Sequence, residues 1–338
     1  MKNNDSVEIQ LISSIRKNFP QMTKVPRGFV GIGDDCAVIP QSASQMQIVS
    51  TDMLVEGVHF LFNRIKPEDL GYKSLAVNLS DIAAMGGIPK YAFLSMSLPK
   101  NFEYKWVKKF YKGFQDLAKT HKVLLLGGDT TGSGIISISV TILGEVNLKK
   151  IKKRSMAQAG DLIYVTGPLG DSRAGLEWVL KESPIYPKNI QTLVHRHYRP
   201  RPHIEEGLWL SQFPQVHAMM DLSDGLASDL RQIQTQSNCG AQIELDNLPL
   251  SAELLSAAQN LKFDPKSYAL LGGEDYVLMF TVEKSSGPAL EKKFFKKFKR
   301  KLFKVGSVTS KSNRLEVKGD ADSEYKPLSK TIQGFRHF

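Results

Sequence analysis

Short segments that combine carboxylates with small residues recur along the chain, and most of them follow an apolar run or lie at a helix end. Five of these segments are Gly33-Asp34-Asp35, Ser50-Thr51-Asp52, Asn78-Leu79-Ser80-Asp81, Gly127-Gly128-Asp129-Thr130-Thr131 and Asp221-Leu222-Ser223-Asp224-Gly225. No cysteine or histidine cluster accompanies them. Oxygen ligands without nitrogen or sulfur suit Mg²⁺ or a similar hard cation, which in turn suits a polyphosphate. The pattern therefore indicates metal-assisted phosphoryl transfer on loops that a layered scaffold brings together.

Strand-like and helix-like stretches alternate loosely in both halves of the chain. In the first half we expect helices at 6–18, 68–85 and 103–120, and strands at 36–39, 46–51, 57–61, 91–98, 122–126 and 135–146. In the second half we expect strands near 162–165, 241–245, 275–282, 302–309 and 313–317, helices near 171–182, 188–197 and 203–212, and a strand–loop–helix unit over 217–237. The basic, irregular stretch 147–160 marks a boundary between domains 1–148 and 149–338. An α/β or α+β fold with two layers follows.

The formal net charge of +11 is concentrated in two basic runs. Residues 291–304 hold eight bases and one acid, and residues 149–154 add five bases, so the rest of the chain is close to neutral. We expect the first run to be an amphipathic helix that passes into a strand, with its apolar face buried: Phe294, Phe295, Phe298, Leu302 and Phe303. Binding of an acidic partner is the alternative for this run.

The small number of cysteines and the lack of a long apolar run indicate the cellular compartment to expect. Cys36 and Cys239 are the only cysteines, which fits a reducing cytosol. No uninterrupted apolar run approaches roughly 18 residues, so we expect a cytoplasmic protein without a membrane span. Cys36 has no paired histidine nearby in sequence, and we expect a buried thiol rather than a nucleophile.

The usual phosphate-binding signatures are absent, since neither G-x-x-x-x-G-K-[ST] nor G-x-G-x-x-G occurs. If ATP binds, carboxylates must hold its phosphates through metal ions. Asp81 is the strongest single indication, because an acid in the last turn of a helix is disfavoured by about 0.3–1 kcal/mol and a cation would compensate. Each segment also has an ordinary explanation. Asp34 and Asp35 suit a solvated turn, Ser223 or Asp224 suits a helix N-cap, and Asp81 could be exposed or paired with a lysine.

Several segments taken together, in order and over nearly the whole chain, resemble the bacterial thiamine-monophosphate kinase family. They are GIGDDCAVIP (31–40), STDMLVEGVHF (50–60), AVNLSDIAAMGG (76–87), LLGGDTTG (125–132), DLSDGLASDL (221–230), GGEDYVLMFTV (272–282) and GFRHF (334–338). The acidic loops are shared with aminoimidazole ribonucleotide synthetase and selenophosphate synthetase. GGEDY and the aromatic tail point to the thiamine branch. Arg336 departs from the tail pattern, where an acid is frequent.

The resemblance implies a reaction in which ATP and thiamine monophosphate give ADP and thiamine diphosphate with several Mg²⁺ ions. It implies a homodimer joined through strands of the N-terminal domain, with nucleotide in the cleft between the two domains. The metal-binding positions it implies are Asp35, Ser50, Thr51, Asp52, Asp81, Asp129, Asp221 and Asp224. The ATP-contacting positions are Gly128, Asp129, Arg154 and Ser223. The substrate positions are His59, Glu274 and Phe335.

Two rival readings stay open at this point. One is a sister enzyme that uses ATP to activate an amide or a selenide. Selenide activation would want a reactive cysteine or selenocysteine in a glycine-rich N-terminal segment, and the first 30 residues contain no cysteine. A nucleic-acid-binding regulator would use the two basic runs, but the many acids elsewhere argue against it.

Overall fold

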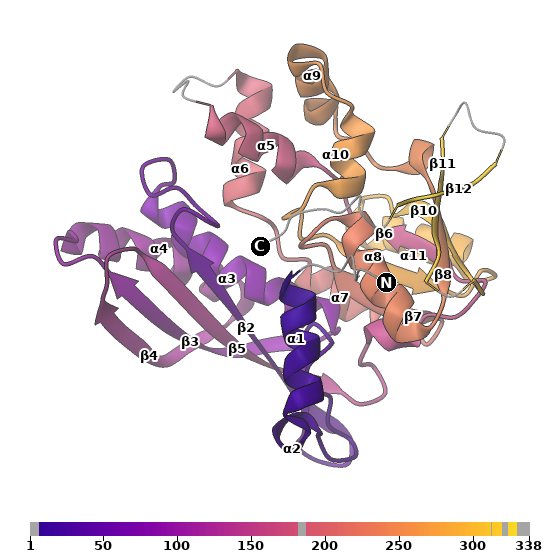
Figure 1. The fold of residues 1–338 in the computed structure, drawn as a ribbon, viewed down its shortest axis with the longest axis horizontal. Helices are drawn as coiled ribbons and strands as arrows, with labels where there is room; N and C mark the ends of the chain where they lie inside the picture. Colours follow the sequence, from indigo (N-terminus) through magenta and orange to yellow (C-terminus); the bar gives the residue numbers. More distant parts are fainter. Residues whose placement is uncertain (1–6, 182–186, 312, 320–323, 330–338) are drawn as a thin grey trace.

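The computed structural model describes residues 7–181, 187–311, 313–319 and 324–329, and it contains two β-sheets with helices packed on them (Figure 1). The first sheet has the strand order β1-β2-β5-β3-β4: β1 (Ala37–Pro40), β2 (Gln45–Val55), β3 (Ile88–Leu98), β4 (Leu124–Gly132) and β5 (Ser137–Asn147). The second has the order β12-β11-β8-β10-β6-β9-β7: β6 (Leu162–Val165), β7 (Val216–Asp221), β8 (Gly240–Glu244), β9 (Leu278–Val282), β10 (Phe303–Thr309), β11 (Leu315–Lys318) and β12 (Lys326–Pro327). Each sheet is antiparallel except for one parallel pair, β3 with β4 and β8 with β11. The α+β form of the expected class is confirmed.

The α-helices of the first half are α1 (Val7–Asn18), α2 (Pro20–Thr23), α3 (Pro67–Ala84) and α4 (Tyr104–His121). Those of the second half are α5 (Asp171–Leu180), α6 (Lys188–Tyr198), α7 (Ile204–Leu210), α8 (Leu226–Ser237), α9 (Ala252–Leu261), α10 (Pro265–Leu271) and α11 (Gly287–Phe298). Short 3₁₀ turns cover Arg154–Met156 and Leu245–Asn247. The sequence did not predict α9 and α10. Across the helices of the described ranges, none is both long enough and apolar enough to cross a bilayer.

Helix α3 positions the most important loops because it lies between the two sheets (Figure 1). Proline at its start and Glu68 and Asp69 in its first turn favour initiation there. Its side chains are buried on nearly every face, which is what a helix packed on both sides requires. It ends before Gly86, whose φ of +69° suits glycine, and the predicted stop at Gly86-Gly87 is confirmed.

The second sheet is covered on both faces. Phe294 of α11 and Leu210 of α7 belong to the same core as Phe280 on one face, whereas Leu230 and Ile233 of α8 pack on the other. The amphipathic helix expected in the basic run exists as α11, with Phe294 fully buried and Leu302 buried after it. Phe295 is 51% exposed, so that part of the prediction is wrong. It follows Phe294 directly and therefore leaves the buried stripe of a 3.6-residue period.

Two expectations about the first sheet are also wrong. Residues 57–61 form a loop with an isolated bridge between Glu56 and Phe60, not a strand. Strand β4 does not end at 126 but continues to Gly132, so the segment 127–132 lies inside an edge strand rather than in a loop beyond it. An ideal Cβ on Gly128 would lie 1.7 Å from the carbonyl oxygen of Leu94, which explains why glycine stands within this strand.

Helices α3 and α4 cover one face of the first sheet, and its other face is open in the single chain. Along β3 the buried residues alternate with exposed ones, and the exposed set includes Ile88, Tyr91 and Phe93. Every residue of the edge strand β4 is exposed, Leu124 and Leu126 among them. This face is apolar and lacks a cover among the described residues.

Candidate active site

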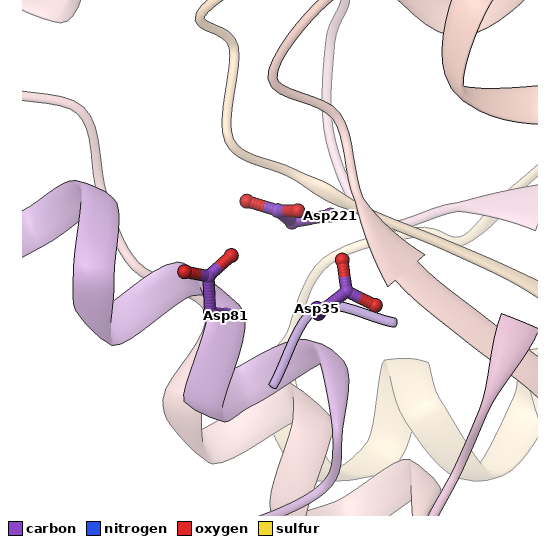
Figure 2. Close-up of side chains that lie close together, drawn as sticks. All are labelled: Asp35, Asp81 and Asp221. Atoms are coloured by element: carbon purple, nitrogen blue, oxygen red, sulfur yellow. The ribbon is translucent and has the colours of Figure 1, made fainter. Parts of the chain in front are cut away.

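Three aspartates from distant parts of the chain converge between the two sheets. Asp35 precedes β1, Asp81 lies in the last turn of α3, and Asp221 ends β7. Each offers one carboxylate oxygen that lies within 4.8 Å of the other two, and Figure 2 shows the three side chains pointing toward a common space. A trio of oxygen ligands at this spacing suits a hard divalent cation.

The electrostatics of this cluster oppose full ionisation in the absence of a cation. Burial and the neighbouring acids raise the pKa of Asp81 well above its ordinary value, and burial with the charge of Asp35 raises the pKa of Asp221 to about 8. Burial raises the pKa of Asp52 to about 6, and burial with Asp35 raises that of Asp34 to about 7. A bound cation would reverse these shifts, because it favours the charged form of each carboxylate.

Arg154 supplies a positive charge to one side of the cluster. Its Nη2 donates to Asp35 Oδ1 at 2.7 Å and its Nε to Asp35 Oδ2 at 3.3 Å, a two-point contact. Its backbone N–H donates to Asp34 Oδ1 at 3.3 Å. The residue expected to contact ATP thus lies directly beside the acidic loop.

Strand β2 presents Ser50 and Asp52 to α3. The Ser50 hydroxyl donates to Asp81 Oδ2, and the Asp52 N–H donates to Asn78 Oδ1 at 3.2 Å. The Thr51 side chain alternates to the opposite face, where its hydroxyl lies 3.0 Å from that of Thr141. Of the three neighbours in β2, Ser50 and Asp52 therefore face the cluster with their side chains.

Two backbone hydrogen bonds join the loop 221–225 to the loop 272–276. The N–H of Glu274 donates to the carbonyl of Ser223 at 2.7 Å, and that of Tyr276 to the carbonyl of Leu222 at 2.9 Å. Asp229 of α8, which the sequence reading did not single out, accepts from the N–H groups of Asp224 and Gly225, each at 3.1 Å. Ser223 and Asp224 consequently have fixed places at the cavity wall.

Glu274 occupies an unusual backbone conformation, with φ at +64° in a residue that has a side chain. Its carboxylate lies 2.8 Å from Lys73 Nζ and 3.2 Å from His197 Nδ1. His59, in the loop after β2, accepts the Val55 N–H on its Nδ1 at 3.0 Å. Strained backbone held by a dense set of contacts is typical of ligand-binding positions.

A cavity of about 1090 Å³ is lined by residues of both halves of the chain. Among its lining residues are Asp52, Asp81, Asp221, Ser223, Asp224, His59 and Glu274. Its volume lies slightly above the usual range of roughly 300–1,000 Å³ for ligand sites, so two small molecules can be accommodated. Asp81 and Asp221 of the acidic cluster therefore line the same continuous space as Glu274.

Two groups of predicted residues are not part of this constellation. Gly128 and Asp129 lie on β4, and Asp129 pairs in register with Ser95, on the sheet face away from α3. Phe335 and Arg336 lie outside the described residues.

Comparison with known proteins places the chain in a family. Two family models match it: AIR synthase related protein, N-terminal domain, over residues 33–146, and AIR synthase related protein, C-terminal domain, over residues 158–318. Thiamine-monophosphate kinase of Buchnera aphidicola subsp. Schizaphis graminum is 40% identical over 338 residues, covering 98% of each chain. The chain belongs to the thiamine-monophosphate kinase family. The thiamine-monophosphate kinase of Haemophilus influenzae is 39% identical over 326 residues, covering 96% of each.

Solved structures of the thiamine-monophosphate kinase family share the complete fold. The structure named AaThiL complexed with AMPPCP and TMP has a TM-score of 0.83 at 34% identity and covers 98% of this chain and 97% of that one. Thiamine monophosphate kinase from Aquifex aeolicus has a TM-score of 0.78 at 35% identity, with 93% and 97% covered. The hydrogenase maturation protein HypE in complex with ATP, at 15% identity and a TM-score of 0.66, shares the fold alone.

For this member of the thiamine-monophosphate kinase family, the acidic cluster predicts how stability changes with pH. The folded-state pKa values of Asp52, Asp34 and Asp221, about 6, 7 and 8, lie above the ordinary 3.8. Their contribution to stability is therefore complete below about pH 4 and is lost as pH rises through 6 to 8. In EDTA the melting temperature should fall between pH 5 and pH 8, and excess Mg²⁺ at pH 8 should restore it. A melting temperature insensitive to both pH and Mg²⁺ would contradict the assignment.

Proposed function

We propose that the protein transfers the terminal phosphoryl group of ATP to thiamine monophosphate, giving thiamine diphosphate in the last step of its synthesis. The observation that carries this proposal is that Asp81 and Asp221, whose carboxylates lie close to that of Asp35, line the same cavity as Glu274. Family membership and the complex named for AMPPCP and TMP support the same reaction. ATP and thiamine monophosphate are both anionic, so joining them requires concentrated positive charge.

The donor set of this chain fits Mg²⁺. Asp35, Asp81 and Asp221 offer mutually close oxygens, and burial together with the neighbouring acids raises the pKa of Asp81 and Asp221, so a bound cation would favour their ionised forms. The residues proposed to hold several such ions are Asp35, Ser50, Thr51, Asp52, Asp81, Asp129, Asp221 and Asp224. Thr51 would do so through its backbone carbonyl, since its hydroxyl lies beside that of Thr141 on the opposite face. Bound Mg²⁺ supplies neutralisation of phosphate charge and a template for in-line geometry.

The protein groups themselves orient the reactants. A phosphate monoester oxygen is already an adequate nucleophile, so no protein nucleophile is required. Cys36 is buried, and burial raises the pKa of its thiol further, which makes it unsuitable for that role. Arg154, Ser223, Gly128 and Asp129 are proposed to contact ATP.

The thiamine phosphate is assigned to the part of the cavity near Glu274. His59 and Glu274 line the cavity wall there. Phe335 is proposed to stack on a ring of the substrate.

A homodimer through the first sheet is part of the proposal. The open apolar face, with Tyr91, Phe93, Leu124 and Leu126 exposed, is the kind of surface that a second copy of the chain covers. The edge strand β4 has unpaired backbone groups along one side, which favours pairing of this strand, or packing of the sheet face, with a second copy of the chain. A second copy also offers a route by which Asp129 reaches a site that it does not reach within its own chain.

The remaining parts of the proposal concern organisation and location. A boundary at residue 148 agrees with the end of β5 at Asn147 and the start of β6 at Leu162. Buried, unpaired Cys36 and Cys239 support a reducing, cytoplasmic setting. No role in binding nucleic acid or membranes is proposed.

An assay of the purified protein with Mg-ATP tests the reaction. Thiamine monophosphate should be converted to thiamine diphosphate with one ADP formed per product, and free thiamine should give no product. Conversion of free thiamine, or ATP hydrolysis without diphosphate formation, would overturn the proposal.

A further inference from the structure

A buried charged cluster lies at one end of the cavity and joins the two halves of the chain. Lys73 of α3 is fully buried, and its Nζ lies 2.8 Å from Glu274 Oε1. His197 of α6 is 3% exposed, and its Nδ1 lies 3.2 Å from Glu274 Oε2 and 3.0 Å from the hydroxyl of Ser172. One carboxylate therefore has a separate partner on each oxygen.

The cost of burying the Lys73 ammonium explains why it lies beside a carboxylate. Moving an ammonium group out of water costs several kcal/mol unless a close partner compensates. For Lys73, Glu274 is the anionic partner that lies within ion-pair distance among the described residues. Although burial alone raises it, the pKa of Glu274 is lowered below its ordinary value, chiefly by the charge of Lys73. Burial and the Lys73 charge lower the pKa of His197 to about 3, so the imidazole is neutral.

The same helix carries Lys73 and the metal-site residue Asp81. Eight residues separate them, which is slightly more than two turns and about 12 Å along the axis. Asp81 points to the acidic cluster and Lys73 to Glu274 of the other half. Helix α3 thus sets the separation between the two ends of the cavity.

We infer that Lys73 and His197 are positioning residues that hold the Glu274 carboxylate ionised and oriented at the cavity wall, where it accepts a hydrogen bond from the amino-substituted ring of the substrate. This inference rests on the proposed function. The φ of +64° at Glu274 places its backbone in a conformation that a free loop would seldom keep, and the two side-chain partners hold the carboxylate itself.

The charge balance decides what kind of ligand Glu274 recognises. An ionised carboxylate has about four acceptor positions, and Lys73 Nζ and His197 Nδ1 each lie beside one of its oxygens. The Glu274 side chain is still 23% exposed and lines the cavity, so acceptor positions are left for a ligand. Because Lys73 already neutralises its charge, Glu274 serves as a hydrogen-bond acceptor rather than as a net counter-charge for a cationic ring.

Replacing Lys73 by methionine tests the inference, because the change keeps the length of the side chain and removes the ammonium. The KM for thiamine monophosphate should rise about 10-fold or more, the cost expected for losing a charged hydrogen-bond arrangement. The KM for ATP should stay within a factor of two. In a Glu274→Gln background the same change should add less than it does alone, since both act through one carboxylate.

A matched control is available in Lys152, a second buried lysine, whose Nζ donates to the carbonyls of Phe213 and Val216. Lys152→Met should lower the melting temperature without changing either KM. If Lys73→Met behaves in the same way as this control, the inference is overturned. Should Lys73→Met fail to fold, the pair His197→Gln and His197→Phe decides. Glutamine keeps a donor and should retain most of the affinity for thiamine monophosphate, whereas equal KM values for the pair would refute the inference.

A substrate analogue separates the inference from the proposed function. Thiamine monophosphate with hydrogen in place of the ring amino group should bind the wild-type protein about 10-fold more weakly, and Lys73→Met should lose that discrimination. If the wild type phosphorylates both molecules equally well, the positioning inference fails while the proposed function stands. Absence of any turnover by the wild type would instead refute the proposed function.

Discussion

Replacing Asp81 by asparagine is expected to lower kcat for thiamine diphosphate formation by about a hundredfold or more. The change removes one of the three carboxylates whose oxygens lie within 4.8 Å of one another, and it also removes the acceptor of the Ser50 hydroxyl. An amide carbonyl is a weaker ligand than a carboxylate for a hard cation. The activity should recover only partly when Mg²⁺ is raised, and steady-state kinetics over a range of Mg²⁺ concentrations would measure this.

The same variant should not be less stable than the wild type when metal is absent. Burial and the neighbouring acids raise the pKa of Asp81 well above its ordinary value, so its ionised form opposes folding at neutral pH. Thermal unfolding in EDTA at pH 7.5 should therefore give an equal or higher melting temperature for Asp81→Asn. Asp116→Asn on the exposed face of α4, where Asp116 pairs with Lys112, is the matched control and should leave kcat unchanged. A kcat for Asp81→Asn close to that of the wild type would refute the ligand role.

Each aspartate of the acidic cluster can be recognised from the sequence around it. Their convergence in space cannot be recognised in that way. Asp221 follows an apolar run and Asp35 a glycine-rich segment, and the predicted position of Asp81 in the last turn of α3 is confirmed. Their meeting depends on α3 packing against both β2 and β7, and the contact with β7 joins residues over a hundred positions apart. Only the resemblance to a family carried that information at the level of sequence.

The sequence did not predict the roles of three further residues, for a different physical reason: Lys73, His197 and Asp229. Each lies inside a helix, where a charged or polar residue is usually solvated, and nothing local marks it as buried. The partner of Lys73 and His197 is Glu274, which reaches them through tertiary packing. A lysine amid otherwise buried positions of a helix was the one available signal.

Glycine suggests a loop over 127–132, but these residues belong to the strand β4. Along β4, glycine instead permits close approach to β3, where a Cβ on Gly128 would collide with the Leu94 carbonyl. The consequence is functional as well as structural. Asp129 is held on a sheet, with its direction set by strand pairing rather than by a loop that could fold back toward the acidic cluster.

Strand register shows how far Asp129 lies from that cluster within one chain. Asp129 pairs with Ser95, Ser95 with Ser139, and Ser139 with Met53, the neighbour of Asp52. Three strand spacings of about 4.8 Å separate the ends of this row by about 14 Å. The row also faces away from α3, whereas Asp81 belongs to α3 itself. If Asp129 is a ligand, as proposed, it serves a site whose Asp81 belongs to a second copy.

Mixing two inactive variants tests this arrangement directly. Asp81→Asn and Asp129→Asn should each be nearly inactive alone, because every site of either homodimer lacks one ligand. Co-expression with different affinity tags yields mixed dimers in which one site carries both substitutions and the other carries neither. A statistical mixture of chains should then recover about a quarter of wild-type activity, and purified mixed dimers about half, since an isologous dimer has two equivalent sites. If Asp129 serves its own chain, every site of the mixed dimer keeps one substitution, and co-expression restores nothing.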